Sequence, residues 1–232
     1  MASDTSFGEV RKFEDFLVTA IADLPEIDVY GVTGSTIAVV DGGLDGRLRL
    51  DMGVSNDDDV AAVSFGALNW TAGNAPMRME ARIILSAITD NKFFVGFGDS
   101  IASADETTFS MTTDTVTLDT MSDAIGIGYD KDASTDQLWA VAGKTDTVTV
   151  EKGLGSDYNP VAATPTTLGV SLSLDRKSAQ FFVDGKEVHR IDSATTLIAA
   201  VDLVPGVWAY EQATAFNLDV DYIFGAKGRS TT

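Results

Sequence analysis

Alternating hydrophobic and polar positions dominate the chain after residue 30. In an extended strand successive side chains point to opposite faces, so a period of two places one set of residues in a core and the other set outward. Five longer segments keep this period, and they cover residues 47–52, 77–86, 125–129, 168–174 and 216–224. Shorter strands are predicted at 36–40, 60–67, 92–97, 138–142, 147–150 and 207–210. The pattern predicts an all-β chain.

The last long segment shows the alternation with large side chains. Its apolar set is Phe216, Leu218, Val220, Tyr222 and Phe224, and its polar set is Asn217, Asp219 and Asp221. We therefore expect the apolar set on one buried face and the polar set on the opposite face. Earlier in the chain, Arg78 and Arg82 flank Glu80 at a spacing of two, which favours a charge ladder on an outward face.

Turn signals separate the predicted strands and set the fold class. Asp184-Gly185 lies between the apolar segment 181–183 and the segment 186–188, and Asp-Gly tolerates the positive φ angles of a two-residue hairpin. Strands joined by turns, with no alternating helices, favour a two-sheet antiparallel jelly-roll sandwich over a parallel-sheet fold. Neither an interdomain linker nor an internal repeat is evident, so residues 26–232 are predicted to form one sandwich domain.

The first 25 residues follow a different pattern. Apolar residues recur at steps of three and four, which is the spacing of one helical face, and they are Phe13, Phe16, Leu17, Ala20, Ile21 and Leu24. Pro25 would end such a helix. A strand over 13–19 is the alternative. Residues 1–25 are therefore predicted to be an N-terminal arm, with a short helix, that attaches the domain to neighbouring molecules.

Composition and charge narrow the function. The 232 residues are 44% hydrophobic and 22% charged, enough apolar side chain for a sizeable core. The formal net charge of −19, from 35 acidic and 16 basic side chains, disfavours nucleic acid and anionic membranes as partners. No stretch is long enough for a membrane-spanning helix, and no secretory signal is expected at the N-terminus. Cysteine is absent, which excludes disulfides and thiolate metal sites.

Candidate catalytic residues are few. His189 is the only histidine, and no G-x-S-x-G motif supplies a nucleophile for it. Asp219 and Asp221 could be the acid pair of a glycan hydrolase. Laminarinase-type glucanases carry a third acid on the same strand, whereas position 223 here is isoleucine. A solvated outer face is the better interpretation, so no catalytic residue is predicted and the chain is expected not to be an enzyme.

Two acidic loops are candidate calcium sites. Asp130, Asp132 and Asp136 share one loop, and residues 57–59 are three consecutive aspartates. The first loop lacks the glycine and the final acid of an EF-hand, and the second is a contiguous run of the kind that usually extends into water. Gly126 and Gly128 lie within a predicted strand, so they do not form a phosphate-binding loop. No metal or cofactor is predicted.

The three tryptophans could contribute to a sugar-binding surface. Trp139 has the opposite parity to Leu138 and Ala140, so it is expected to face away from the core. Aromatic side chains more often fill cores or oligomer contacts than stack on sugars. We therefore expect Trp70, Trp139 and Trp208 to be core or interface residues, with a glycan as the alternative ligand.

Several segments resemble the concanavalin A-like jelly rolls that tailed bacteriophages carry as virion structural proteins. The resemblance covers about residues 13–229 and rests on 80–89 leading into 93–99, on 122–130 followed by 137–141, on 220–223, and on 13–17. It implies a non-enzymatic protein that decorates or cements the outer capsid surface of a virion. The implied partners are the major capsid protein and further copies of the chain, with a trimer as the expected oligomer.

The candidate interface residues are those of the arm: Phe13, Phe16, Leu17 and Ile21. A carbohydrate-binding, lectin-like module for host attachment is the alternative function. A glycan hydrolase that uses Asp219 and Asp221 is a third hypothesis, supported only by the spacing of the two acids.

Overall fold

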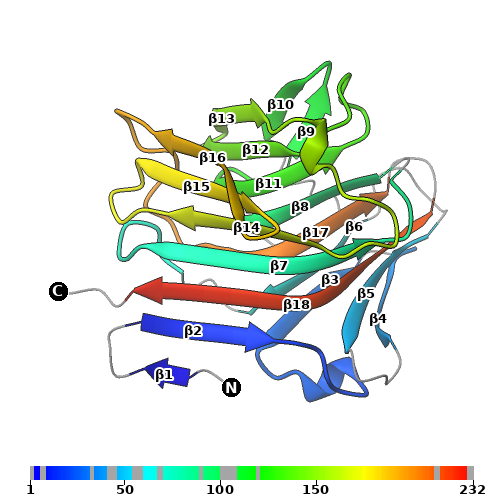
Figure 1. Ribbon diagram of the computed structural model, residues 1–232. Coiled ribbons are helices and arrows are strands. Elements are labelled where there is room, and N and C mark those ends of the chain that lie inside the picture. Colours follow the sequence, from blue (N-terminus) through cyan, green and yellow to red (C-terminus); the bar gives the residue numbers. More distant parts are fainter. Residues whose placement is uncertain are drawn as a thin grey trace.

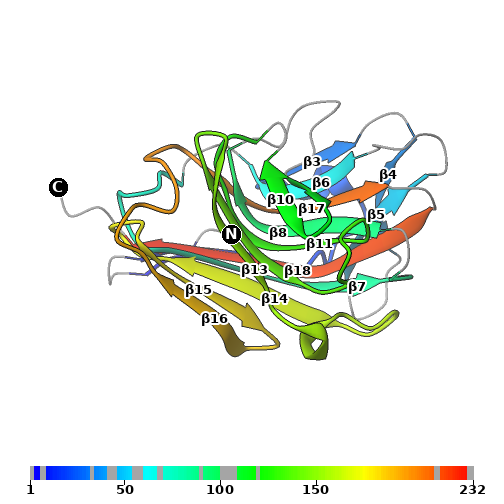
Figure 2. The same ribbon diagram turned by 90° about the horizontal axis from the view of Figure 1, so that it is seen from above.

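Two antiparallel β-sheets pack face to face in the protein, as the computed structural model shows from two directions (Figures 1 and 2). This confirms the all-β jelly-roll sandwich. Helical structure is confined, in the part of the chain that the structure describes, to the single 3-10 turns η1 (Ile21–Asp23) and η2 (Ser156–Tyr158), so no described helix could cross a bilayer. The structure describes residues 3–5, 9–31, 34–40, 46–53, 60–66, 70–88, 91–99, 109–118, 121–211 and 215–228.

The nine-stranded sheet, called sheet A below, has the order β1-β2-β18-β7-β14-β15-β16, with β5 and β4 attached to the other end of β18. Its central strand β18 is 13 residues long, and it pairs with β2 over its second half and with β5 over its first half. The strands are β1 (Ser3–Thr5), β2 (Glu9–Glu14), β4 (Thr36–Val40), β5 (Arg47–Met52), β7 (Met77–Leu85), β14 (Thr166–Leu172), β15 (Ser178–Val183), β16 (Lys186–Asp192) and β18 (Phe216–Gly228).

The seven-stranded sheet, called sheet B, has the order β13-β12-β11-β8-β17-β6-β3 and is the more curved of the two (Figure 2). A separate hairpin of β9 (Phe109–Thr112) and β10 (Thr115–Leu118) lies on the face of sheet B that points away from sheet A. The strands of sheet B are β3 (Ile27–Gly31), β6 (Val60–Phe65), β8 (Asn91–Gly98), β11 (Ala124–Asp130), β12 (Trp139–Lys144), β13 (Thr147–Gly153) and β17 (Val204–Glu211).

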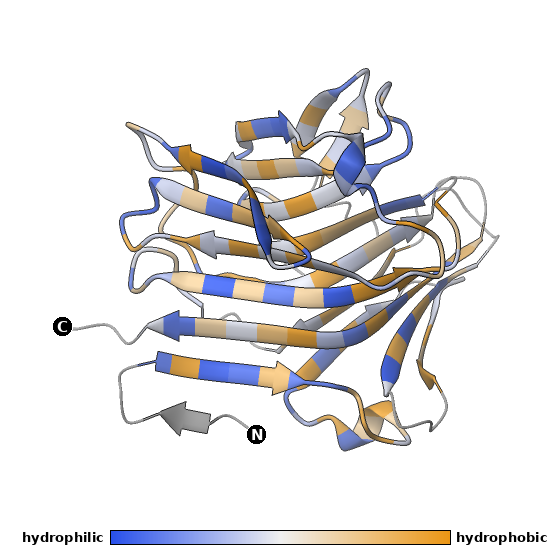
Figure 3. Ribbon diagram, viewed as in Figure 1, coloured by the Kyte–Doolittle hydropathy of each residue, from blue (hydrophilic) through white to orange (hydrophobic). Residues whose placement is uncertain are grey.

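The predicted alternation is visible along the strands of sheet A, where hydrophilic and hydrophobic positions follow one another in β2 and β7 (Figure 3). In β7 every second side chain, from Met77 to Leu85, is buried between the two sheets. The buried set of β5 joins the same core. Burial of one face of each sheet supplies the main driving force for this sandwich.

A second hydrophobic cluster lies on the opposite face of sheet B, beneath the β9–β10 hairpin. It contains Phe94, Phe109, Trp139 and Trp208. Glycines make room for these rings: a Cβ atom at Gly128 would stand 2.4 Å from the ring of Phe109. This face of sheet B is therefore filled by the chain's own side chains.

The last long strand departs from the predicted alternation. A β-bulge between Val220 and Tyr222 shifts the register of β18 against β7. Phe216, Leu218 and Val220 face the core as expected, but after the bulge Ile223 takes the buried position. Tyr222 and Phe224 consequently lie on the outer face of sheet A, so their predicted placement in the core was wrong. A bulge adds one unpaired residue, which reverses the faces of every residue that follows.

The helical pattern near the N-terminus does not form a regular helix. Residues 9–14 are strand β2, which pairs with β18, and only Ile21–Asp23 form a 3-10 turn. Phe16 adopts a positive φ of 54° and is fully buried in the core. Residues 9–14 form a strand because they pair with the edge of β18, although Phe13 belongs to a run of apolar residues that has the spacing of a helix. Tertiary contacts routinely override local propensity in this way.

The predicted hairpin at Asp184-Gly185 is confirmed. Asp184 and Gly185 have positive φ angles of 49° and 73°, as a tight two-residue turn requires. Strands β15 and β16 pair antiparallel on either side of it, with a bulge between Phe181 and Phe182.

Candidate functional site

A groove crosses the outer face of sheet A, the face that points away from the sandwich core. Two adjoining hollows of about 510 and 430 Å³ share Arg78, Ser171 and Gln180 in their linings. The strands involved are β18, β7, β14, β15 and β16, which lie side by side at the front of Figure 1. The two hollows therefore form one continuous open groove, and "the groove" below means both.

The register of the strands places the groove residues in two parallel rows. One row runs Phe224, Glu80, Gly169, Phe182 and Glu187 from β18 to β16. The neighbouring row runs Ala226, Arg78, Ser171, Gln180 and Arg190 along the same strands. Small side chains at Gly169, Ser171 and Ala226 lower the surface between larger neighbours, which is why a hollow forms here.

Aromatic rings bound one part of the groove. Phe224 on β18 and Phe182 on β15 both line it and are both half-buried, with Gly169 between them on the floor. A Cβ atom at Gly169 would have Met79 O at 3.2 Å and Glu80 Cβ at 3.7 Å. An alanine therefore almost fits at this position, and the glycine keeps the floor low without being required by the packing of the strand.

Arginines concentrate on the outer face of sheet A. Six of the eight arginines in the sequence lie there, and they are Arg11, Arg47, Arg49, Arg78, Arg82 and Arg190. Acidic side chains pair with them: Glu9 with Arg11 and Arg78, Asp219 with Arg47 and Arg49, Asp221 with Arg82, and Glu187 with Arg190. A chain of net charge −19 thus presents one face on which positive and negative groups are interspersed. The charge ladder predicted around Glu80 is part of this surface.

Arg78 lies where the two hollows of the groove meet. Its guanidinium carbon is 5.4 Å from the centroid of the Phe224 ring, a cation–π arrangement. Its Nη2 atom is 3.5 Å from Oε1 of Glu9, and half of its side chain (51%) is exposed. Arg190, at the far side of the groove, is held by two hydrogen bonds from its Nε and Nη2 atoms to Glu187.

Tyr222 and Glu80 form a hydrogen bond beside the groove. The Tyr222 hydroxyl donates to Oε1 of Glu80 at 2.5 Å, and Arg82 lies over the Tyr222 ring. Burial of the phenol, and then its hydrogen bond to the Glu80 carboxylate, raise the pKa of Tyr222 to about 12. The neutral phenol therefore persists well above neutral pH and keeps Glu80 fixed at the groove edge.

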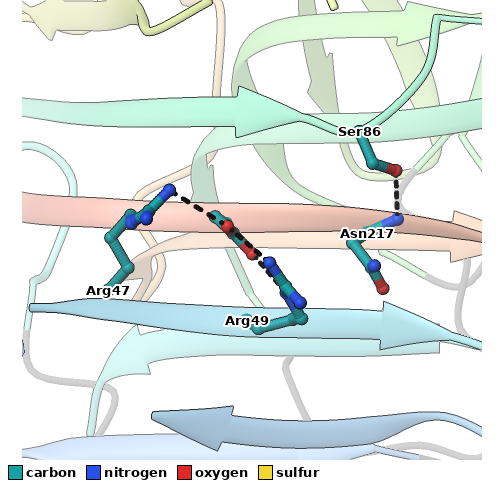
Figure 4. A network of polar contacts seen from close by, with 5 residues as sticks. Arg47, Arg49, Ser86 and Asn217 are labelled. Atoms are coloured by element: carbon teal, nitrogen blue, oxygen red, sulfur yellow. Dashed lines mark hydrogen bonds and ion pairs between the residues drawn. The ribbon is translucent and has the colours of Figure 1, made fainter. Parts of the chain in front are cut away.

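The two predicted catalytic candidates on β18 are engaged in ion pairs. Figure 4 shows Arg47 and Arg49 reaching from β5 to the carboxylate of Asp219, and Ser86 accepting a hydrogen bond from the backbone of Asn217. Asp221, at the bulge, pairs with Arg82. Both carboxylates are thus occupied by arginine side chains of neighbouring strands. The outer-face interpretation of Asp219 and Asp221 therefore fits their surroundings better than a proton-donating role.

His189 lies on β16, partly buried, with its ring 6.0 Å from the Phe181 ring and nearly parallel to it. Burial, and then the positive charge of Lys152, lower the pKa of His189. Its surroundings are those of a packed aromatic side chain at the sheet edge.

The acidic loops do not assemble a metal site within the described ranges. Asp130 is buried and accepts hydrogen bonds from the backbone nitrogens of Met111 and Asp132, and Asp136 pairs with Lys131. These contacts hold the β9–β10 hairpin and the loop after β11. The run at 57–59 lies outside the described residues.

The tryptophans are core residues. Trp70, Trp139 and Trp208 are at most 7% exposed. Trp139 does face away from the sandwich core, as its parity predicted, but the β9–β10 hairpin covers it. Phe182, Tyr222 and Phe224 are partly exposed on the outer face of sheet A. Reasoning from the sequence missed Tyr222 and Phe224 because the bulge in β18 was not predicted.

The four candidate interface residues of the N-terminal segment separate into two groups. Phe13 and Leu17 are exposed (52% and 59%), and the Phe13 ring lies 5.6 Å from the Tyr222 ring, tilted by 34°, on the outer face. Phe16 is buried and Ile21 packs against the core, so these two side chains support the fold of the chain itself. Only Phe13 and Leu17 remain available to a partner molecule.

The fold has many counterparts among solved structures. A protein of unknown function from Shewanella oneidensis MR-1 aligns with a TM-score of 0.66 at 11% identity, over 100% of this chain and 92% of that one. Peanut lectin aligns with a TM-score of 0.63 at 16% identity, over 97% and 99%. A carbohydrate esterase of the Shiga toxin-encoding bacteriophage phi24B aligns with a TM-score of 0.51 at 14% identity, over 90% and 92%.

Comparisons of sequence are less informative. No family model matches the chain. No curated protein matches it either. At these identities the structural likeness establishes the fold alone, and that fold is the concanavalin A-like jelly roll, which confirms the expected fold class.

Proposed function

We propose that the protein is a glycan-binding module without catalytic activity and that the groove on sheet A holds the sugar. The observation that carries this proposal is the pair of half-buried rings, Phe224 and Phe182, in one groove with Glu80 and Gly169 between them. Sugar rings stack their apolar faces on aromatic side chains while their hydroxyls bond to polar neighbours. Glu80, Ser171 and Gln180 supply such polar groups within the same groove.

The dimensions of the groove favour a short oligosaccharide. Phe224 and Phe182 are three strand positions apart, so roughly 14 Å separates their backbones at the usual spacing of strands. Glu80 and then Gly169 lie between Phe224 and Phe182, so this part of the groove offers a polar group beside a low floor, and this arrangement suits several linked sugars. The groove continues past Arg78 toward Arg190, which extends the length available to a chain.

The structural neighbours support the proposal without establishing it. One of them is a lectin and another is a carbohydrate esterase, so this fold occurs in proteins concerned with sugars. Binding without turnover is favoured because Asp219 and Asp221 are both engaged in ion pairs with arginines of neighbouring strands. The glycan-hydrolase hypothesis therefore has the least support.

A glycan array followed by calorimetry tests the proposal. Wild-type protein should bind one class of oligosaccharide, and Phe224→Ala or Phe182→Ala should weaken that binding by roughly tenfold, the loss expected for one aromatic stacking contact. Leu17→Ala is the control, because Leu17 is an exposed apolar side chain that does not line the groove. Absence of any sugar binding by the wild type, or equal losses in all three variants, would contradict the proposal.

A virion decoration protein is the second candidate function. The exposed Phe13 and Leu17 favour it, because they form an apolar surface beside the edge of sheet A that a capsid subunit or a second copy could cover. Mass spectrometry of intact particles, together with measurement of the oligomeric state, tests this role. Detection of the chain in purified virions would support it, and absence from them would exclude it.

A further inference from the structure

We infer that the glycan bound in the groove carries carboxylate groups, and that Arg78 recognises one of them. The inference rests on the proposed glycan-binding function and specifies its ligand class: oligosaccharides that contain uronic or sialic acids. The observations that lead to it are the position of Arg78, its bonding state and the charge of its surroundings.

Arg78 differs from the other arginines of the outer face. Arg11, Arg47, Arg49, Arg82 and Arg190 each donate at least one hydrogen bond to a carboxylate of the chain. Arg78 donates none within the described residues, and the acidic side chain with which it forms an ion pair, Glu9, is 3.5 Å away. A guanidinium has five N–H donors, so most of those of Arg78 are available to a ligand.

The position of Arg78 matches the path of a bound sugar chain. It is one of three residues that line both hollows of the groove. Its guanidinium is held over the Phe224 ring, the same ring that we propose to contact a sugar. A planar guanidinium held in this way has lost part of its rotational freedom before a ligand arrives, which lowers the entropic cost of a two-bond contact with a carboxylate.

The charge around Arg78 selects among anionic ligands. Glu9, Glu80 and Glu187 line or flank the groove, and the whole chain carries −19. A densely charged polyanion such as a nucleic acid would be repelled by these carboxylates. A glycan that carries one carboxylate on a sugar ring can place it at Arg78 and keep its hydroxyls near the glutamates, which accept hydrogen bonds from them.

Calorimetric titration with paired ligands tests this inference. The probes are oligogalacturonate and sialyllactose, each compared with the same sugar after its carboxyl groups are reduced to alcohols. Wild-type protein should bind at least one acidic probe roughly tenfold to a hundredfold more tightly than its reduced form, the range for a charge-assisted hydrogen-bonded pair. Arg78→Gln should abolish that preference and leave the affinity for the reduced sugar within about twofold.

Two further variants separate recognition from general charge. Lys152→Gln removes one positive charge from the exposed surface of β13 in sheet B, and it should leave the preference for the acidic sugar intact. Arg78→Lys keeps the charge but not the planar two-bond geometry, so it should restore only part of the preference. Thermal unfolding of each variant checks that the fold is retained.

The outcomes distinguish the inference from the function on which it rests. If the wild type binds acidic and reduced sugars equally, or if Arg78→Gln keeps the preference, the inference is overturned and the glycan-binding function stands. If Lys152→Gln loses as much preference as Arg78→Gln, net charge accounts for the selectivity and the role of Arg78 is overturned. If the wild type binds no sugar, acidic or neutral, both the inference and the proposed glycan-binding function are overturned.

Discussion

Arg49 and Asp219 pair across β5 and β18 through two hydrogen bonds, with Nε 2.7 Å from Oδ1 and Nη2 3.0 Å from Oδ2. The Asp219 side chain is only 7% exposed, so the two N–H donors of Arg49 replace most of the water that would otherwise solvate the carboxylate. Arg47 reaches the same carboxylate at 3.4 Å. The contact joins the branch of sheet A that contains β4 and β5 to the central strand.

Arg49→Lys should therefore destabilise the protein although it conserves the charge. A lysine ammonium cannot donate in the same two-bond geometry, and the buried carboxylate would lose part of its solvation. We expect the free energy of unfolding in urea to fall by about 1–3 kcal/mol. Arg190→Lys is the matched control, because Arg190 makes a similar two-bond contact with an exposed partner, Glu187. Its effect should be much smaller, because both partners of that ion pair are solvent-exposed, and equal effects would refute the argument.

Phe16 and Leu17 are neighbours in the chain with opposite surroundings. Phe16 is fully buried, whereas Leu17 is 59% exposed. Phe16→Ala should lower the free energy of unfolding by about 3–5 kcal/mol, the usual cost of removing a buried phenylalanine. Leu17→Ala should change it by about 0.5 kcal/mol or less. Denaturant unfolding of both variants measures the difference, and similar losses would contradict the burial of Phe16.

Tyr222 should ionise late in an alkaline titration. Burial and the Glu80 hydrogen bond raise its pKa from 10.0 to about 12, and burial likewise raises the pKa of Tyr129 to about 12. Because the folded state holds the neutral phenols, the stability they contribute is complete below pH 10 and is lost as the pH rises toward 12.

Absorbance at the phenolate band measures this ionisation directly. Tyr222→Phe should remove one of the late-titrating phenols, and Glu80→Gln should make Tyr222 ionise at lower pH, because the carboxylate is one cause of the shift. Tyr129→Phe is the control: it removes a second late-titrating phenol and should leave the response to Glu80→Gln unchanged. An unaltered titration in Glu80→Gln would rule out the coupling of the two side chains.

Substitution by alanine should leave the stability of the protein unchanged at Gly169 and lower it at Gly128. At Gly169 an added Cβ meets Met79 O at 3.2 Å and the Cβ and Cγ atoms of Glu80 at 3.7 Å, and the gain in strand propensity offsets the tight contact with Met79 O. Gly169→Ala should therefore keep the melting temperature and weaken glycan binding by raising the groove floor. At Gly128 the Cβ would stand 2.4 Å from the Phe109 ring, so Gly128→Ala should cost about 1–3 kcal/mol by overpacking.

Binding titration and thermal unfolding of both glycine variants provide the measurement. Gly128 lies on β11 of sheet B, remote from the groove, so any Gly128→Ala protein that remains folded should bind sugars with normal affinity. Full glycan affinity in Gly169→Ala would show that the ligand does not approach this floor.

Much of the architecture follows from local sequence pattern. The alternation in 47–52 and 77–85 predicts strands because a period of two can bury only one face of a sheet. Asp184-Gly185 predicts a tight hairpin because few other residue pairs accept two positive φ angles in a row. The spacing of Arg78, Glu80 and Arg82 likewise predicts an outward charged face.

The candidate site was not predictable in the same way. Phe224, Gly169 and Phe182 are distant in sequence and become neighbours only through the order β18-β7-β14-β15. The bulge after Val220 also moves Tyr222 and Phe224 from the expected core face to the outer face. No local signal in 216–224 marks that extra residue, because its cause is the pairing of β18 with partners on both sides.

The sequence by itself therefore determines that this is an acidic, cysteine-free β-sandwich with an outward row of alternating charges. These features follow from the alternation of side chains in an extended strand, where residues two positions apart share a face. The tertiary structure alone decides that the β9–β10 hairpin covers Trp139, that Asp219 and Asp221 are held by arginines from other strands, and that two phenylalanines face outward with Glu80 and Gly169 between them. These features depend on strand order and register, which arise from the packing of the whole chain.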